Sequence, residues 1–274
     1  MRILTSLLAL LVLAPLGAQS PWSQELDVDA FGTKGPDGLQ INGAYSLRKV
    51  LSGPRTEPFA YVQLGAVVAA NPAYGFGGLF VEAQPAPFLV LRAERSALRF
   101  FGTAGCLLSF PTASAPFGDD AIKARKGQEE SVGGARTLLQ ATPQVRFGQV
   151  VLRHQATFGW WQFGGRGPWF YEYENDTLLR NRDRTSDQQT FALWESDWGA
   201  FKTYSGGTFQ VTRASDAGLE RRRLGLVLSF DYKEGGGRWG KPRGGLIIGR
   251  NQADPNRKGE LYATCSLGTS WTIR

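Results

Sequence analysis

Histidine, methionine and cysteine are scarce in this chain of 274 residues. It has one histidine, one methionine and two cysteines, and the cysteine spacing excludes a Cys-x-x-C redox or zinc site. It also lacks a Gly-x-Ser-x-Gly elbow, a His-Glu-x-x-His helix and a phosphate-binding loop. Charged residues make up 20%, below the ~25% usual for soluble domains. Glycine is abundant, with 35 residues, and aromatic residues make up 12%, which is typical of curved β-sheets and argues against an all-helical fold.

Long apolar runs are missing after residue 18, so no segment reaches the ~20 residues of a membrane-spanning helix. The amino terminus combines Arg2, an apolar core from Leu7 to Leu16 and the small residues Gly17 and Ala18. This pattern predicts a signal peptide over residues 1–18 and export from the cytoplasm. We expect one mature domain over residues 19–274, whose first part, residues 19–38, is a periplasmic segment.

The formal net charge is +7, but the basic residues are scattered at alternating positions and no nucleic-acid motif accompanies them. We therefore expect no nucleic-acid partner. The basic residues are better suited to a polar lumen or to contact with anionic lipid.

Apolar and polar residues alternate through most of the chain, with breaks at Gly, Pro, Asn and Asp clusters. In one segment Leu224, Leu226 and Leu228 share a face, and Ser229 and Asp231 lie on the other. Several segments have the 9–11 residues of a tilted transmembrane strand. Twelve such segments can be placed, at 39–51, 57–70, 76–84, 88–95, 97–110, 136–147, 149–162, 188–196, 200–213, 220–232, 242–250 and 259–273.

The lengths of the connecting segments support a membrane barrel. Long connectors at 111–135, 163–187, 214–219 and 251–258 fall on one side, and tight turns at Ser96, Gly148 and 197–199 fall on the other, as in outer-membrane barrels. The sequence predicts an all-β fold, a single antiparallel transmembrane barrel of twelve strands, with ten to fourteen open. Fourteen would require both 25–33 and the alternating segment 169–174 to pair. A β-sandwich would show similar alternation, but the small and polar second face would make a poor sandwich core.

In this general plan the chain resembles Gram-negative outer-membrane β-barrel proteins. One local segment, Tyr173-Glu174-Asn175-Asp176 followed by Asp183-Arg184-Thr185, is similar to a signature of outer-membrane lipid A 3-O-deacylases and to a barrel-like group labelled polymorphic toxins. The deacylase resemblance implies ester hydrolysis by Asn175 and Asp176 with a histidine and Ca²⁺. That family places its histidine downstream of the pair, whereas His154 lies upstream, so the catalytic role is not carried over.

The same region holds five carboxylates, Glu172, Glu174, Asp176, Asp183 and Asp187, which supply the oxygen ligands that Ca²⁺ prefers. Candidate calcium ligands are Glu174, Asp176, Asp183 and Asp187. Because arginines are interspersed, the preferred interpretation is that these charges pair or are solvated in an outer loop, and no cofactor is expected. Arg180, Arg182 and Arg184 would bind lipid phosphates if they lie at the rim.

His154 shares a face with Leu152, Ala156 and Phe158, which predicts a structural histidine on the apolar face of a strand. Cys106 and Cys265 fall in strands that would not be neighbours. They are interpreted as two small wall residues, although an oxidising compartment would permit a bridge.

The leading hypothesis for function is a non-enzymatic outer-membrane barrel, either a narrow passage or a structural surface protein. The alternatives are a rim-located lipid hydrolase using His154, Asn175 and Asp176, and a periplasmic β-sandwich binding protein. Expected partners are outer-membrane lipids, lipopolysaccharide and the barrel assembly machinery.

Overall fold

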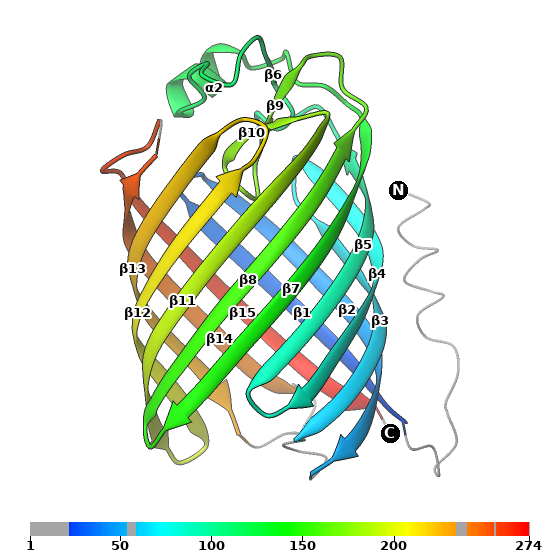
Figure 1. The fold of residues 1–274 in the computed structure, drawn as a ribbon, viewed down its shortest axis with the longest axis vertical. Helices are drawn as coiled ribbons and strands as arrows, with labels where there is room; N and C mark the ends of the chain where they lie inside the picture. Colours follow the sequence, from blue (N-terminus) through cyan, green and yellow to red (C-terminus); the bar gives the residue numbers. More distant parts are fainter. Residues whose placement is uncertain (1–21, 54–58, 234–239, 255, 274) are drawn as a thin grey trace.

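The chain forms a closed antiparallel β-barrel of twelve strands. The computed structural model describes residues 22–53, 59–233, 240–254 and 256–273, so the expected signal peptide lies outside the described residues. The strands tilt steeply around the barrel (Figure 1). In chain order they are β1 (Trp22–Lys34), β2 (Gly38–Ser52), β3 (Ala60–Ala70), β4 (Tyr74–Ala86), β5 (Leu89–Phe100), β7 (Gly133–Phe147), β8 (Val150–Phe163), β11 (Arg182–Trp198), β12 (Phe201–Ala214), β13 (Leu219–Tyr232), β14 (Lys241–Ala253) and β15 (Leu261–Ile273).

The barrel closes through β1 and β15, which pair from Gln24 opposite Ile273 to Lys34 opposite Ala263. Every other wall strand also has a hydrogen-bonded neighbour on each side, so the sheet has no free edge. This closed ladder satisfies the backbone polar groups of the wall internally, as a membrane-spanning sheet requires. It also excludes the β-sandwich alternative.

The alternation of side chains divides each strand between the outer wall and the lumen. Leu224, Leu226 and Leu228 lie on the outer face, and Leu226 is 75% exposed. Val227 is buried in the interior, and the inward Ser229 lies opposite Tyr204 in the register of β12. The two faces of this segment are therefore those predicted from the sequence.

The strand count was predicted correctly, but two assignments were wrong. Segments 88–95 and 97–110 were expected to be separate strands with a turn at Ser96. They merge into β5, where Ser96 pairs with Gly78 on one side and Arg136 on the other. Ser96 is buried and donates a hydrogen bond to Glu94, so its polarity serves the lumen rather than a turn.

The second wrong assignment is the amino-terminal segment. Residues 19–38 were expected outside the barrel, but 22–34 form β1. Its inward face carries Asp27 and Asp29, which pair with Arg243. A strand at 25–33 was expected only in the fourteen-strand alternative. The segment 169–174 does pair, but in a small separate sheet, so the wall has twelve strands and not fourteen.

The sides expected for the long connectors and for two of the tight turns are confirmed, whereas the turn expected at Ser96 lies inside β5. The long connections 101–132 and 164–181 lie at one end, here called the capped end, together with 215–218 and 254–260. Tight connections at 87–88, 148–149 and 199–200 lie at the other end, where β1 begins and β15 ends (Figure 1). The Gly148 and 197–199 turns were thus placed on the correct side.

A cap of loop elements covers one end of the barrel (Figure 1). It contains β6 (Ser109–Phe110), α2 (Asp119–Ala124), β9 (Trp169–Glu172) and β10 (Thr177–Arg180), and the three short strands form a sheet in the order β10-β9-β6. Among the described residues, no helix is long and apolar enough to cross a bilayer.

The apolar core of the protein lies where the cap meets the lumen, and not in the wall. Inward residues of β4, β5 and β8 pack against the cap there; fully buried members are Tyr74, Phe100, Cys106, Leu107, Phe170 and Leu179. Cys106 was expected in a wall strand but lies in a turn of the cap. Both cysteines are free, and Cys265 faces outward from β15.

Candidate functional site

The loop between β8 and β11, residues 164–181, is here called the plug because the tip of its hairpin enters the lumen. Glu172 shapes this tip by accepting hydrogen bonds from the backbone amides of Glu174 and Asn175, both at 2.8 Å, and from Nδ2 of Asn175 at 2.7 Å. Asp176 closes the turn with a positive φ of 47°, a conformation that Asn and Asp adopt more readily than most residues.

Asp176 is almost fully buried, and three arginines surround its carboxylate. Arg221 Nη1 lies 3.1 Å and Arg223 Nη2 lies 3.2 Å from Oδ2, and both arginines project inward from β13. Arg257 Nε, from the loop between β14 and β15, lies 3.2 Å from Oδ1. The Tyr171 hydroxyl donates to Oδ1 at 2.8 Å. One carboxylate thus serves as the shared counter-charge of three buried guanidinium groups.

Arg257 connects the plug to the rest of the cap. It is 1% exposed, and its Nη2 lies 2.7 Å from Asp119 at the start of α2. The hydrogen bond from Arg257 lowers the pKa of the Asp119 carboxyl, which favours its charged form. Through this arginine, the plug, α2 and the 254–260 loop hold one another in place.

A second ion pair fixes the other side of the plug tip. Glu174 pairs with Arg136 of β7, whose side chain is 5% exposed. Arg136 also lies 3.3 Å from Glu94 of β5 and stacks over the Phe76 ring at 3.9 Å. The tip is therefore attached by charge to two separate parts of the wall, Asp176 to β13 and Glu174 to β7, which have β12, β11 and β8 between them.

A close contact with a glycine completes the docking. The Tyr173 hydroxyl lies 2.8 Å from Thr33 Oγ1 of β1, directly over Gly38 of β2. A Cβ built at Gly38 would lie only 1.4 Å from the Tyr173 hydroxyl oxygen. A larger residue at position 38 therefore displaces the Tyr173 ring from this position and breaks its contact with Thr33.

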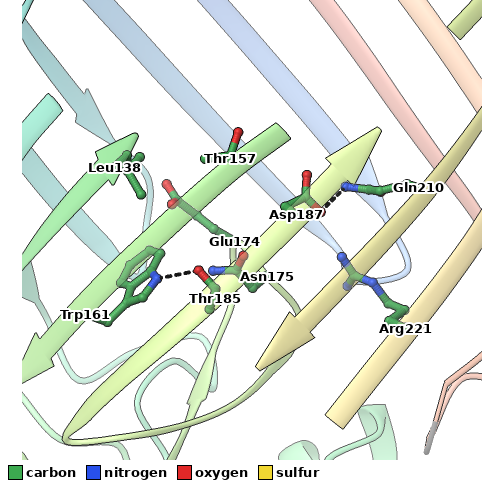
Figure 2. Close-up of a pocket in the computed structure, with 9 residues that line it drawn as sticks. All are labelled: Leu138, Thr157, Trp161, Glu174, Asn175, Thr185, Asp187, Gln210 and Arg221. Carbon is green, nitrogen blue, oxygen red and sulfur yellow. Dashed lines mark hydrogen bonds between the residues drawn. The ribbon is translucent and has the colours of Figure 1, made fainter. Parts of the chain in front are cut away.

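Cavities lie in the lumen against the plug tip. The larger, about 520 Å³, is lined by Tyr173, Glu174 and Asp176 of the plug and by inward residues of the wall, including Gln155, Arg221 and Arg223. A smaller one, about 150 Å³, lies beside Asn175. Figure 2 shows Glu174 and Asn175 of the plug among the wall residues Trp161, Thr185, Asp187 and Arg221. Trp161 Nε1 donates a hydrogen bond to Thr185 Oγ1.

Further from the cap, the lumen is lined by charged residues that pair along the wall. Arg243 bridges Asp27 and Asp29 at 3.1 and 2.8 Å, and Arg48 lies 2.8 Å from Glu25. Other inward pairs join Arg92 to Glu82 and Glu94, and Arg146 and Lys202 to Glu195. This surface is suited to water and polar solutes and is unlike the apolar core at the cap.

Burial, and after it the neighbouring negative charge of Glu174, raise the pKa of Glu172 to about 7, in spite of the lowering by its three hydrogen-bond donors. This carboxyl supports the turn of the plug. Its protonation therefore changes within the neutral pH range, at the point where the plug enters the lumen.

The structure separates the residues of the hydrolase hypothesis. His154 lies on the outer wall, with Nδ1 2.8 Å from Thr190 Oγ1, while its neighbour Gln155 lines the lumenal cavity. Asn175 and Asp176 lie inside the barrel. The predicted structural position of His154 on the apolar face agrees with this geometry, and no base from this histidine reaches the Asn-Asp pair.

The candidate calcium ligands also lie apart. Glu174 and Asp176 pair with arginines, Asp183 accepts backbone hydrogen bonds from Arg180, Arg184 and Asp216, and Asp187 accepts from Gln210 and Thr212. In the part of the chain that the structure describes, no group of three His, Cys, Asp or Glu residues is arranged to hold a metal ion.

The three phosphate candidates lie at or near the capped end. Arg182 and Arg184 begin β11, and Arg184 is 66% exposed. Arg180 belongs to the plug and stacks over Trp169 at 4.9 Å. On the neighbouring strands, outward Arg213 and Arg222 are each 51% exposed and share Glu220.

Sequence reasoning missed Arg136, Arg221, Arg223 and Arg257. The run Arg221-Arg222-Arg223 did carry a signal, because alternation places its first and third members inward when Leu224 faces outward. Their common partner Asp176, however, is 45 or more residues away, and nothing local indicates that contact.

Comparison with known proteins yields no family. No family model matches the chain, and no curated protein gives a significant sequence match. Among solved structures, an outer membrane channel from Pseudomonas putida F1 has a TM-score of 0.45 at 9% identity, covering 94% of this chain and 100% of that one. The beta domain of the Bordetella autotransporter BrkA has 0.44 at 12%, covering 91% and 98%. LpxR from Salmonella typhimurium has 0.44 at 7%, covering 89% and 99%. At such identities and scores the likeness assigns this chain neither a family nor an activity.

Proposed function

We propose that this protein is a non-enzymatic passage across the outer membrane, closed at one end by its own plug. The observation that carries this proposal is the docking of the hairpin tip inside the lumen. There the plug contacts the wall through ion pairs and through Tyr173, which lies over Gly38 and is hydrogen-bonded to Thr33. A cavity of about 520 Å³ lies beside these contacts.

The dimensions and the outward face of the wall support outer-membrane placement. Its strands are 11–17 residues long, enough to cross the apolar layer when tilted, and the outward face is apolar along the middle of β13. Long connections normally face the cell exterior in such barrels and short turns the periplasm. The plug therefore closes the external opening.

The plug is built to separate from the wall without disrupting it. Its sheet, β10-β9-β6, shares no ladder with the barrel, and the contacts of its tip with the wall are made by charged or hydroxyl groups. Phe170 and Leu179 of the plug also pack in the apolar core at the cap. Water or another anion must replace the buried ion pairs when the plug leaves, because an uncompensated buried charge is costly. A structural barrel needs neither a lumenal cavity nor a separable closure, so these features favour a passage.

Replacing Gly38 tests the closure without altering a charge. Gly38→Leu places a side chain where the Tyr173 hydroxyl lies, so Tyr173 loses its place and we expect the plug to undock. We expect a channel in planar bilayers whose conductance exceeds that of the unmodified protein at least tenfold. Gly43→Leu is the matched control, because Gly43 lies on the same strand and faces outward.

The two variants distinguish the outcomes. Heat-modifiable migration in gels shows whether each variant is a folded barrel. Low conductance of folded Gly38→Leu, equal to that of Gly43→Leu, would contradict closure by the plug. If the unmodified protein already conducts as well as Gly38→Leu, the docked plug does not close the lumen.

We also propose that outer-leaflet lipopolysaccharide binds the arginine rim, defined as Arg184, Arg213, Arg222 and Arg250 on β11 to β14. These side chains are exposed on the outer wall near the capped end, where lipid A phosphates lie, and arginine pairs with phosphate through two parallel hydrogen bonds. Replacing all four by glutamine should weaken co-purification of lipopolysaccharide. Unchanged retention would contradict this assignment.

A further inference from the structure

Asp176 occupies a site that is built for an anion. Its carboxylate is contacted by Arg221, Arg223 and Arg257 and by the Tyr171 hydroxyl, all at 3.2 Å or less. Arg221 and Arg223 belong to the wall strand β13 and not to the plug. The plug therefore supplies the negative group, and the wall supplies a receptor for it.

The wall arginines are held independently of Asp176. Arg223 Nε donates to Asn251 Oδ1 at 2.9 Å, its Nη2 donates to the Gly35 carbonyl at 3.0 Å, and its guanidinium lies over the Tyr262 ring. Arg221 Nη2 donates to Thr212 Oγ1 at 3.3 Å. These contacts orient both guanidinium groups toward the lumen before any anion arrives.

The site has unused binding capacity. Arg221 is 5% exposed, and its Nε and Nη1 have no aligned hydrogen-bond partner among the described residues. Asp176 is the carboxylate within ion-pair distance of Arg221 and Arg223 in the described chain. Undocking of the plug thus leaves two inward guanidinium groups without a counter-charge, and such a state is costly unless another anion enters.

We propose that Arg221 and Arg223 form the binding site of a small anionic solute with carboxylate or phosphate groups, and that Asp176 is its internal competitor. The inference rests on the proposed passage and names its solute class. The adjoining cavity of about 520 Å³ is within the range of small-molecule sites, ~300–1,000 Å³. Because the solute binds only when Asp176 has left, it shifts the population toward the open state.

The test uses Asp176→Asn, which removes the competing charge and keeps the size of the side chain. In planar bilayers with a KCl gradient, we expect this variant to conduct and to prefer chloride over potassium. Adding Arg221→Gln and Arg223→Gln should lower the chloride preference at least threefold. Arg95→Gln together with Arg99→Gln is the matched control, because both arginines lie on the wall strand β5 and face outward, away from the lumen.

Citrate and inorganic phosphate then distinguish the two anion chemistries, with glycerol as the neutral control. In Asp176→Asn, the effective anion should block chloride current at a concentration at least tenfold lower than in the variant that also lacks Arg221 and Arg223. Block by citrate alone assigns carboxylates, and block by phosphate alone assigns phosphates.

The outcomes separate this inference from the proposed function. If neither Asp176→Asn nor Gly38→Leu conducts, the passage itself is refuted. If both conduct, but selectivity and anion block are the same with and without the two arginines, the passage stands and the anion site is wrong.

Discussion

Removing the Asp176 carboxylate should release the plug. In Asp176→Ala, three guanidinium groups lose a shared partner that is 1% exposed, and the Tyr171 hydroxyl loses its acceptor. Breaking a buried ion pair by removing one partner costs ~3–5 kcal/mol. Because ~1.4 kcal/mol corresponds to a tenfold change in an equilibrium constant, we expect the ratio of undocked to docked protein to rise by about two to four orders of magnitude.

Amide hydrogen exchange over β9 and β10 measures this release directly. The amides of Phe170, Leu178 and Leu179, which lie in the small sheet, should exchange faster by a similar factor, while those of β13 stay protected. Asp216→Ala is the control, because Asp216 is an acid near the same end that lies 3.9 Å from the exposed Arg184. Unchanged exchange of the plug in Asp176→Ala would refute the assignment of Asp176 as its anchor.

Three further predictions follow from single side chains. Burial and a negative neighbour raise the pKa of Glu172 from 4.5 to about 7, so the docked plug binds this proton more tightly than the free plug does. Docking should therefore weaken as pH rises from 4.5 to 7, and channel recordings should show more frequent opening, a trend that Glu172→Gln removes; an unchanged slope would contradict this role. Leu226→Arg should cost ~2–4 kcal/mol at the membrane midplane and reduce assembled protein, whereas inward Ser229→Arg should not; equal yields on heat-modifiability gels would contradict the facing. Cys106, fully buried in the cap with a pKa raised by burial, should react with a charged maleimide in Gly38→Leu and not in the unmodified protein, both carrying Cys265→Ser; equal labelling would show that the cap does not loosen with the plug.

The wall could be predicted from the sequence because its rules are local. Period-two alternation fixes which residues face lipid, and an antiparallel barrel fixes which connections share an end. Leu226 and Ser229 were assigned to the correct faces on this basis. The interpretation of the pattern was wrong where inward residues are charged or small. A strand at 25–33, which carries Asp27 and Asp29, was expected only in the fourteen-strand alternative, and Ser96, which lies inside β5, was interpreted as a turn.

The plug could not be predicted because its contacts are long-range. The acidic segment 172–176 was recognised as unusual, but interspersed arginines pointed to local pairing or solvation. The real partners are Arg136 and the pair Arg221 and Arg223, brought to the tip by the curvature of the closed wall. Gly38 gave no signal either, since the reason for a glycine there is a tyrosine 135 positions later.

The most direct test of the passage removes the plug entirely. Phe163 N donates to the Asn181 carbonyl at 2.8 Å, so the two ends of the plug already lie side by side, and a short Gly-Ser turn can replace residues 165–179. The variant should assemble as a folded barrel and show a stable single-channel conductance in planar bilayers, whereas the unmodified protein stays closed. A folded, plug-free barrel that does not conduct ions would contradict the proposal that this protein is a plugged passage.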